Sequence, residues 1–328
     1  MKTINFYAFG TFILTLALTP ALLAKGKINN IQSTGSLKTN GCSYFFPKNM
    51  YSEKIEDRVA KIIKKNGDEI HILGETHAMP FSDDEITDEA LGKDFPNDKL
   101  EVILNKFYET NVDVIKYLKD NVKFLSQIHT YDTNYLAVEA NDEDVKYLMQ
   151  NSSEQLTLLK DKIDGTTFTK KKKDELTMLI FNDWLYVYRK SPKKFKNIKI
   201  IGLDMSSNKI IKPLRSYFKT TESFDKKVKE IAPKAHNDFS KLNSMLFSGI
   251  NNNISVGRAF KLFSSKFPKT LHKDLKKYIK VARKMSIINY KRDKLMSKKL
   301  IKQKGNGVLI IGALHTVTLG EHIMRRCQ

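Results

Sequence analysis

Two histidines in this chain follow the same short pattern, one early in the sequence and one near its end. The early run is IHILGETH at residues 70–77, and the late run is VLIIGALH at residues 308–315. Each consists of apolar residues, a glycine, two further residues and a histidine. An imidazole can accept a proton or bind a divalent metal ion. A pair of them, His77 and His315, therefore suggests a site that activates water.

Both runs are typical of buried parallel strands, because they are short, rich in β-branched residues and bounded by glycine. Each also follows a turn signal, Asn66-Gly67-Asp68 in the first case and Gly305-Asn306-Gly307 in the second. The histidines then come just after the carboxyl ends of strands, where open α/β sheets build their sites. If the two strands are neighbours in one sheet, His77 and His315 meet.

Acidic residues stand at the ends of the other predicted strands. The run at residues 135–139 closes on Glu139, and the run at residues 198–204 closes on Asp204. The first histidine pattern contributes Glu75 as well. We therefore expect carboxylates and imidazoles to converge on one edge of the sheet. For Asp204 the alternative is that the acid simply caps a turn.

Two hydrolytic chemistries fit this set of residues. Two histidines and one or two carboxylates can hold a divalent ion such as Mn, Co or Zn that activates water. Alternatively, a carboxylate orients a histidine that deprotonates water without a metal. The chain shows no Gly-x-Ser-x-Gly motif. A single Gly-x-x-His could be merely a turn, but two copies with acids at the other strand ends favour a site.

Four such strands alternate with helical segments, which predicts an α/β fold with a mostly parallel central sheet flanked by helices. Ser52 is placed to cap a helix that ends near Asn66, and residues 100–128 also have helical periodicity. Residues 81–96 form an acidic, turn-rich loop. The long helical segment at residues 206–302 is expected to form an insertion or a cap over the strand ends.

The first 24 residues predict a signal peptide, with Lys2, an apolar run and a small-residue cleavage end. The alternative is a retained membrane anchor. Residues 25–51 are polar and predict a flexible leader, and residues 52–328 a single domain. The mature protein is expected to be periplasmic or secreted.

Only two cysteines are present, Cys42 and Cys327. In an oxidising compartment they could pair and join the two ends of the domain, or they could remain two free thiols. The sequence leaves both alternatives open.

The formal net charge is +21, and most of the positive charge is lysine. No nucleic-acid-binding module or arginine–aromatic interleaving accompanies it. A lysine-rich, solvated surface is the favoured interpretation, without a specific nucleic-acid partner. Weak association with an anionic membrane surface would follow from the same charge.

Several motifs, taken in order, resemble the superfamily that unites erythromycin esterases, ChaN and the TraB/GumN and Tiki proteins. Leu73-Gly74-Glu75-Thr76-His77 and the Arg-Asp-x-x-Met run at residues 292–296 resemble the erythromycin esterase and ChaN branches. The run Gly312-Ala313-Leu314-His315 is similar to the TraB/GumN form. Val138-Glu139 and the Gly-Leu-Asp-Met run at residues 202–205 complete the set.

The resemblance implies a single α/β domain in which Glu75, His77, Glu139 and His315 are the catalytic or metal-binding residues. It also implies that Arg292 supplies a positive charge for a carboxylate ligand or a developing oxyanion. The alternative for Arg292 is a helix-surface arginine paired with Asp293 or another neighbour.

Members of this superfamily include esterases, metal-dependent proteases and haem-binding lipoproteins. We therefore expect an exported hydrolase that acts on an ester or amide in a small molecule or peptide. The alternative is a non-catalytic protein that binds haem or another ligand. The chain lacks the lipid-attachment cysteine of ChaN, which argues against a haem-uptake lipoprotein.

Overall fold

The computed structural model describes residues 36–49, 52, 54–75, 96–150, 152–181, 183–206, 208–247, 254–312 and 315–327. The predicted signal peptide, most of the acidic loop at residues 81–96, and His77 lie outside these residues.

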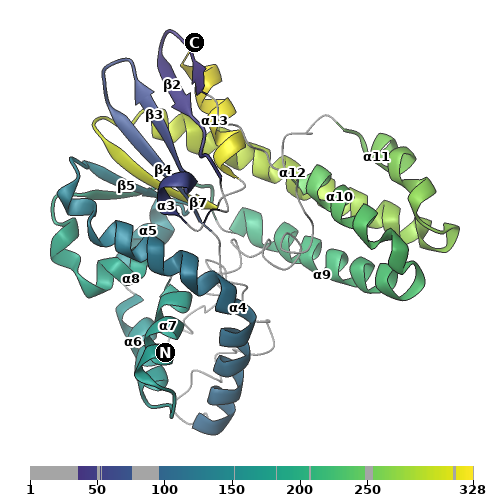
Figure 1. Cartoon of the computed structure of the whole chain (residues 1–328), viewed down its shortest axis with the longest axis horizontal. Coiled ribbons are helices and arrows are strands. Elements are labelled where there is room, and N and C mark those ends of the chain that lie inside the picture. The colour runs from purple at the N-terminus through teal and green to yellow at the C-terminus, as the bar shows by residue number, and fades with distance from the viewer. Residues whose placement is uncertain are drawn as a thin grey trace.

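Within the described residues the chain forms an α/β fold around one mixed sheet of seven strands, in the order β1-β2-β3-β4-β7-β5-β6 (Figure 1). The first four strands pair antiparallel, whereas β4, β7, β5 and β6 pair parallel. All four predicted strands are present, and they form the parallel part. The strands are β1 (Ser36–Lys38), β2 (Cys42–Phe45), β3 (Val59–Lys64), β4 (Glu69–Glu75), β5 (Tyr135–Val138), β6 (Lys199–Gly202) and β7 (Gly307–Gly312).

The burial of strand β7 explains why its sequence is apolar throughout. Every residue of β7 is buried, because the sheet is covered on both faces. Val308 and Ile310 join one hydrophobic cluster, and Leu309 and Ile311 join another on the opposite face.

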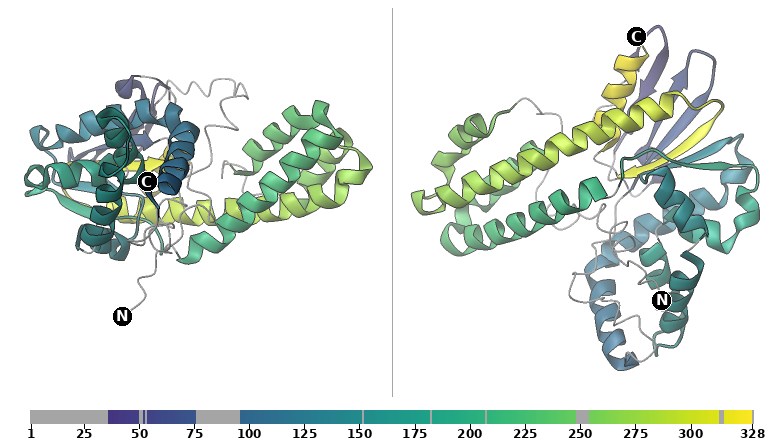
Figure 2. Two further views of the ribbon diagram at one scale, coloured as in Figure 1. Left: turned by 90° about the horizontal axis from the view of Figure 1, so that it is seen from below. Right: turned by 180° about the vertical axis from the view of Figure 1, so that it is seen from behind.

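Helices from different parts of the chain cover the two faces (Figures 1 and 2). The first cluster includes residues of α4 to α8, and the second includes residues of α12 and α13. The described α-helices are α3 (Ile55–Arg58), α4 (Asn97–Ser126), α5 (Asp142–Gln150), α6 (Ser152–Asp164), α7 (Lys170–Phe181), α8 (Asp183–Lys190), α9 (Asn208–Ile231), α10 (His236–Phe247), α11 (Val256–Phe263), α12 (His272–Ile301) and α13 (His315–Arg326).

Helices α9 to α11 and the first two thirds of α12 pack around a third hydrophobic cluster of their own. They project to one side of the sheet as a helical arm, residues 208–291 (Figures 1 and 2). The prediction that this segment is an insertion or a cap over the strand ends stays a prediction.

The predicted helix from Ser52 to Asn66 is wrong. Only Ile55–Arg58 is helical, and β3 follows directly. Burial in β3 alternates, with Ala60 and Ile62 inside, so the apolar residues follow a strand period rather than a helical one. Pairing with β4 satisfies the hydrogen-bonding groups of the β3 backbone. The local sequence pattern cannot reveal this partner strand.

The predicted leader is also partly wrong, because β1 and β2 extend the sheet within residues 36–45. Tyr44 is fully buried, and its hydroxyl donates a hydrogen bond to the carbonyl oxygen of Thr316 at 2.7 Å. Among the described residues, no helix is both long enough and apolar enough to cross a membrane.

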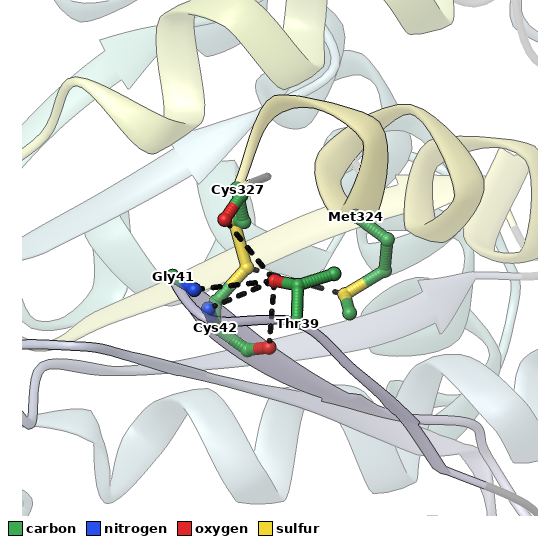
Figure 3. The surroundings of a disulfide bond; sticks show 5 residues. All are labelled: Thr39, Gly41, Cys42, Met324 and Cys327. Carbon is green, nitrogen blue, oxygen red and sulfur yellow. Dashed lines mark hydrogen bonds between the residues drawn. A yellow bond between two sulfur atoms is a disulfide. The ribbon is translucent and has the colours of Figure 1, made fainter.

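Cys42 and Cys327 form a disulfide, which decides between the two alternatives left by the sequence (Figure 3). The bond joins β2 to the residue after α13, with the two Cα atoms 5.6 Å apart. The Thr39 hydroxyl donates to the carbonyl oxygen of Cys327 at 3.1 Å. The first and last described elements are thereby tied together.

We expect the double substitution Cys42→Ser/Cys327→Ser to lower the free energy of unfolding by about 2–5 kcal/mol, a typical loss for a native disulfide. The bond closes a sequence separation of 285 residues, so it strongly restricts the unfolded chain. Urea denaturation of the two proteins measures the change. Wild type under reducing conditions should behave like the double variant, and equal stability in all three samples would contradict the prediction.

Gly202 permits a close approach between the end of β6 and the start of α5. A Cβ atom at this position would lie 2.3 Å from the backbone carbon of Asn141. We expect Gly202→Ala to cost about 1–3 kcal/mol of unfolding free energy, because backbone must move to relieve the clash. Gly257→Ala is the matched control in a helix with open space, and it should not destabilise. Denaturant titration of both variants tests the difference.

Candidate active site

The two strands that carry the histidine patterns are neighbours, as predicted. Strand β4 pairs with β7 in parallel, and Glu75 lies opposite Gly312 at their carboxyl ends. Strand β5 lies on the other side of β7, and Glu139 follows it directly. The structure therefore places Glu75, Glu139 and His315 at one edge of the sheet.

Arg292 reaches this edge from α12 and is almost completely buried. Its Nε atom donates to Asp204 Oδ2 at 2.9 Å, and one terminal nitrogen donates to the same oxygen at 2.6 Å. That nitrogen also forms an ion pair with Glu139. Burial alone would lower the pKa of Arg292, but the carboxylates of Asp204 and Glu139 raise it above its usual value.

Glu139 is held from two sides. Its Oε1 atom faces Arg292, and its Oε2 atom accepts a hydrogen bond from the backbone N–H of Gly312 at 2.7 Å. The Nε2 atom of His315 lies 3.6 Å from Oε1. This carboxylate is therefore fixed in place beside the imidazole.

His315 begins α13 and has a carboxylate on its other ring nitrogen. Its Nδ1 atom lies 2.5 Å from Asp293 Oδ1, and Thr318 donates to the second oxygen of Asp293. Because a carboxylate is an acceptor, Nδ1 carries the proton and Nε2 faces Glu139. Although burial opposes the charged imidazole, Asp293 and then Glu139 raise the pKa of His315 above 6.5.

Glu75 is buried and interacts with a carboxyl group that lies far away in the sequence. Burial, followed by the charge and hydrogen bonding of Asp183, raises the pKa of Glu75 well above its usual value. Asp183, at the start of α8, accepts a hydrogen bond from Asn121 at 2.9 Å. Burial and Asp183 both favour the protonated form of the Glu75 carboxyl, which is the form that can donate a hydrogen bond to Asp183.

Arg58 lies near the same carboxyl groups and is 1% exposed. One of its terminal nitrogens is 3.6 Å from Asp120, and its guanidinium stands 5.2 Å from the ring centre of Tyr117. Burial lowers the pKa of Arg58, while Asp120 opposes that shift. Its charge in turn opposes part of the rise in the pKa of Glu75.

The predicted set is therefore brought together except for His77, which lies outside the described residues. Asp204 is a buried partner of Arg292 rather than an isolated turn cap. The alternative of a surface Arg292 is wrong. Its predicted role toward an external anion stays a prediction, and in this structure its charge is engaged by Glu139 and Asp204.

Three residues of this network were not assigned a role from the sequence: Arg58, Asp183 and Asp293. Asp293 adjoins Arg292 in the Arg-Asp-x-x-Met run, so its position beside the site was a usable signal. Asp183 and Arg58 stand in no motif. Only the folded structure reveals them, because α8 packs against α4 and Arg58 directly precedes the strand that pairs with β4.

The predicted metal site stays a prediction, because His77, one of its four expected ligands, lies outside the described residues. No group of three or more His, Cys, Asp or Glu among them is arranged as a ligand set. The Arg292 guanidinium occupies the space beside Glu139 that a metal cation would need. The Nδ1 atom of His315 is hydrogen-bonded to Asp293. Glu139 and His315 are thus each engaged by another charged side chain of the described chain.

Comparisons with protein-family models, with curated proteins and with solved structures found no match. The superfamily resemblance therefore rests on the motifs themselves.

Proposed function

We propose that the protein is an exported hydrolase in which His315, oriented by Asp293, removes a proton from water at the carboxyl edge of the parallel strands. The observation that carries this proposal is the short contact between His315 Nδ1 and Asp293, which leaves Nε2 directed toward Glu139. A carboxylate that holds the tautomer of a histidine is a recurring device for general-base catalysis.

Glu139 supplies the second contact for the attacking water. Its distance of 3.6 Å from Nε2 is too long for a direct hydrogen bond but suits a shared water molecule. Arg292 and the Gly312 N–H keep this carboxylate in position. In this scheme water donates one proton to His315 and is held by Glu139 as it attacks the substrate carbonyl.

Glu75 is suited to the complementary role of general acid. A carboxylic acid that stays protonated near neutral pH can donate its proton to a leaving group, and pairs of groups with separated pKa values indicate such roles. Glu75 has a raised pKa, and it lies opposite Gly312 on the neighbouring strand. His77, two residues further along, would then be the second imidazole of the site.

The substrate class is an ester or amide of a small molecule or peptide, as the superfamily resemblance implies. Both substrate types need an activated water and a protonated leaving group, and the residues above offer these without a metal or another cofactor. We place the chain in the erythromycin esterase, ChaN and TraB/GumN superfamily on the same ground.

A panel of p-nitrophenyl esters and fluorogenic peptide amides tests the proposal with the mature chain. We expect His315→Ala to lower kcat/KM by about 10²–10⁴, the usual contribution of a general base. His71→Ala is the matched control, since this histidine lies mid-strand in β4 and is 42% exposed. No hydrolysis of any substrate by wild type, or equal loss in both variants, would overturn the proposal.

Glu75→Gln separates hydrolysis from ligand binding. Because the pKa of Glu75 is raised in the folded state, the folded chain binds this proton more tightly than the unfolded chain, and the contribution of Glu75 to stability falls as pH rises above about 4.5. Glutamine avoids that cost and keeps a donor for Asp183, so the variant should fold. Loss of hydrolysis with retained substrate binding supports the acid role, whereas unchanged hydrolysis contradicts it.

A further inference from the structure

Helix α12 exposes one continuous face that consists almost entirely of lysine. Its exposed positions recur mostly every three or four residues, so they form a single stripe along the helix. Eight of the nine residues are lysines, and the ninth is isoleucine. The lysine stripe is Lys273, Lys276, Lys277, Lys280, Lys284, Ile287, Lys291, Lys294 and Lys298.

Among the residues that the structure describes, none of the eight lysines forms an ion pair. The two acids of α12 are engaged elsewhere: Asp274 pairs with Lys227 at 2.9 Å, and Asp293 binds His315. A solvated surface helix usually mixes both signs of charge. This face carries one sign over about 38 Å of helix.

The helical arm shares this excess of positive charge. Residues 208–291 contain 20 Lys and Arg but only 5 Asp and Glu, whereas the whole chain has a net charge of +21. Most of the net charge therefore lies in about a quarter of the sequence. Figure 2 (right) shows α12 running from the arm to the sheet with no other element in front of it.

The chemistry of the stripe favours a lipid surface over a nucleic acid. Lysine carries a compact point charge that attracts anionic lipid headgroups without requiring a particular geometry. Nucleic-acid recognition commonly uses bidentate arginine contacts to phosphate and aromatic side chains that stack on bases. The stripe has neither. Its single apolar member, Ile287, is 40% exposed at the middle of the charged row. A straight row of lysines around an apolar side chain suits a flat anionic bilayer.

We propose that the lysine stripe of α12 docks the protein onto an anionic membrane surface. This inference does not depend on the hydrolytic proposal. The same helix carries Arg292 and Asp293 on its buried side, where they hold Glu139 and His315. Docking through the outer face would therefore set the orientation of the strand-end site relative to the bilayer.

Vesicle co-sedimentation tests the proposal with the mature chain. Phosphatidylcholine vesicles that contain phosphatidylglycerol are compared with vesicles of phosphatidylcholine alone. Each lysine near an anionic surface contributes about fivefold in partitioning. The variant K277Q/K280Q/K284Q/K291Q should therefore bind the anionic vesicles several hundredfold more weakly, on the order of magnitude that four such contributions give. Binding of wild type should fall as salt is added.

The matched control is K170Q/K171Q/K193Q/K196Q, which removes the same charge from exposed lysines outside the arm. It should retain most of the binding. Equal loss in both variants would show a general charge effect and overturn the proposal. So would an absence of binding to anionic vesicles.

Ile287→Gln distinguishes a bilayer from a charged polymer. The substitution should weaken binding to the anionic vesicles and leave any binding to duplex DNA unchanged. Tighter binding of wild type to duplex DNA than to anionic vesicles at the same salt concentration would overturn the choice of a membrane. Circular dichroism confirms that all three variants keep their helical content.

Discussion

Replacing Arg292 with methionine should lower the free energy of unfolding by about 3–5 kcal/mol, the usual cost of breaking a buried ion pair from one side. Arg292 is 1% exposed and is the counter-charge to Asp204 and Glu139, which are themselves buried. Methionine is similar in length but leaves the two buried carboxylates without their arginine counter-charge. The loss arises chiefly from these uncompensated charges rather than from lost packing.

Urea denaturation at neutral pH measures the effect, and Lys284→Met is the control on the same helix. Lys284 is exposed, so its replacement should change stability by no more than about 0.5 kcal/mol. A loss of similar size in both variants would indicate a general effect on α12. Such a result would contradict the role assigned to Arg292.

The combination Arg292→Met/Asp204→Asn/Glu139→Gln gives a sharper test. Removing the two negative charges together with the positive one leaves no uncompensated charge among these three residues, so most of the lost stability should return. If the triple variant is even less stable than Arg292→Met, hydrogen bonding rather than charge compensation dominates this cluster. The comparison thus separates the two contributions.

The parallel strands were predictable because their signal is local. Each is a short apolar run that ends on glycine or an acid, and burial on both faces explains that composition. The repeated Gly-x-x-His pattern suggested that β4 and β7 are neighbours, and their parallel pairing confirms it. Consequently Glu75, Glu139 and His315 could be placed at one edge from the sequence alone.

The antiparallel half of the sheet was not predictable in the same way. Ile55, Val59 and Ile62 lie on one face of a helix by their spacing, and only pairing with β2 and β4 shows that Val59 and Ile62 belong to a strand. The disulfide anchors β2, the partner of β3, to the end of α13. Such contacts join residues that lie far apart in the sequence, so a local sequence pattern does not reveal them.

The hidden members of the site are side chains whose roles depend on tertiary distance. Asp183 approaches Glu75 because α8 packs close to α4, which brings Asn121 beside it. Nothing in the local sequence around Asp183 marks it as a partner of a strand-end carboxyl. Asp293 differs, because its neighbour Arg292 was already a candidate.

Replacing Asp293 with asparagine should lower kcat/KM by about 10²–10⁴, provided that the proposed ester or amide hydrolysis is measured. Asp293 accepts the Nδ1 proton of His315 and thereby keeps Nε2 free to take a proton from water. An asparagine amide can instead donate to Nδ1, which places the proton on Nε2 and removes the base. The loss therefore comes from the wrong tautomer rather than from unfolding.

The pH profile distinguishes this role from a merely structural one. In wild type, Asp293 and Glu139 raise the pKa of His315, so the base becomes active only as pH rises through a value above 6.5. Asp293→Asn removes one of these charges, and the acidic limb of kcat/KM should move to lower pH.

Thr318→Val is the matched control, because it removes the other hydrogen bond to Asp293 without changing charge. The acidic limb of its kcat/KM profile should stay at the wild-type pH, and its loss of activity should be smaller than that of Asp293→Asn. A limb that shifts equally in both variants, or in neither, would contradict the assignment of His315 as the base.

The same pKa change has a consequence for stability, and its sign is fixed by the direction of the shift. A histidine with a raised pKa in the folded state stabilises the fold fully below its unfolded pKa of 6.5. That contribution disappears as pH rises through the folded value. The stability difference between wild type and Asp293→Asn should therefore be larger on the acidic side of this transition than on the alkaline side. Urea denaturation across that pH range measures it, and a difference that grows with pH would show that His315 is not the titrating group.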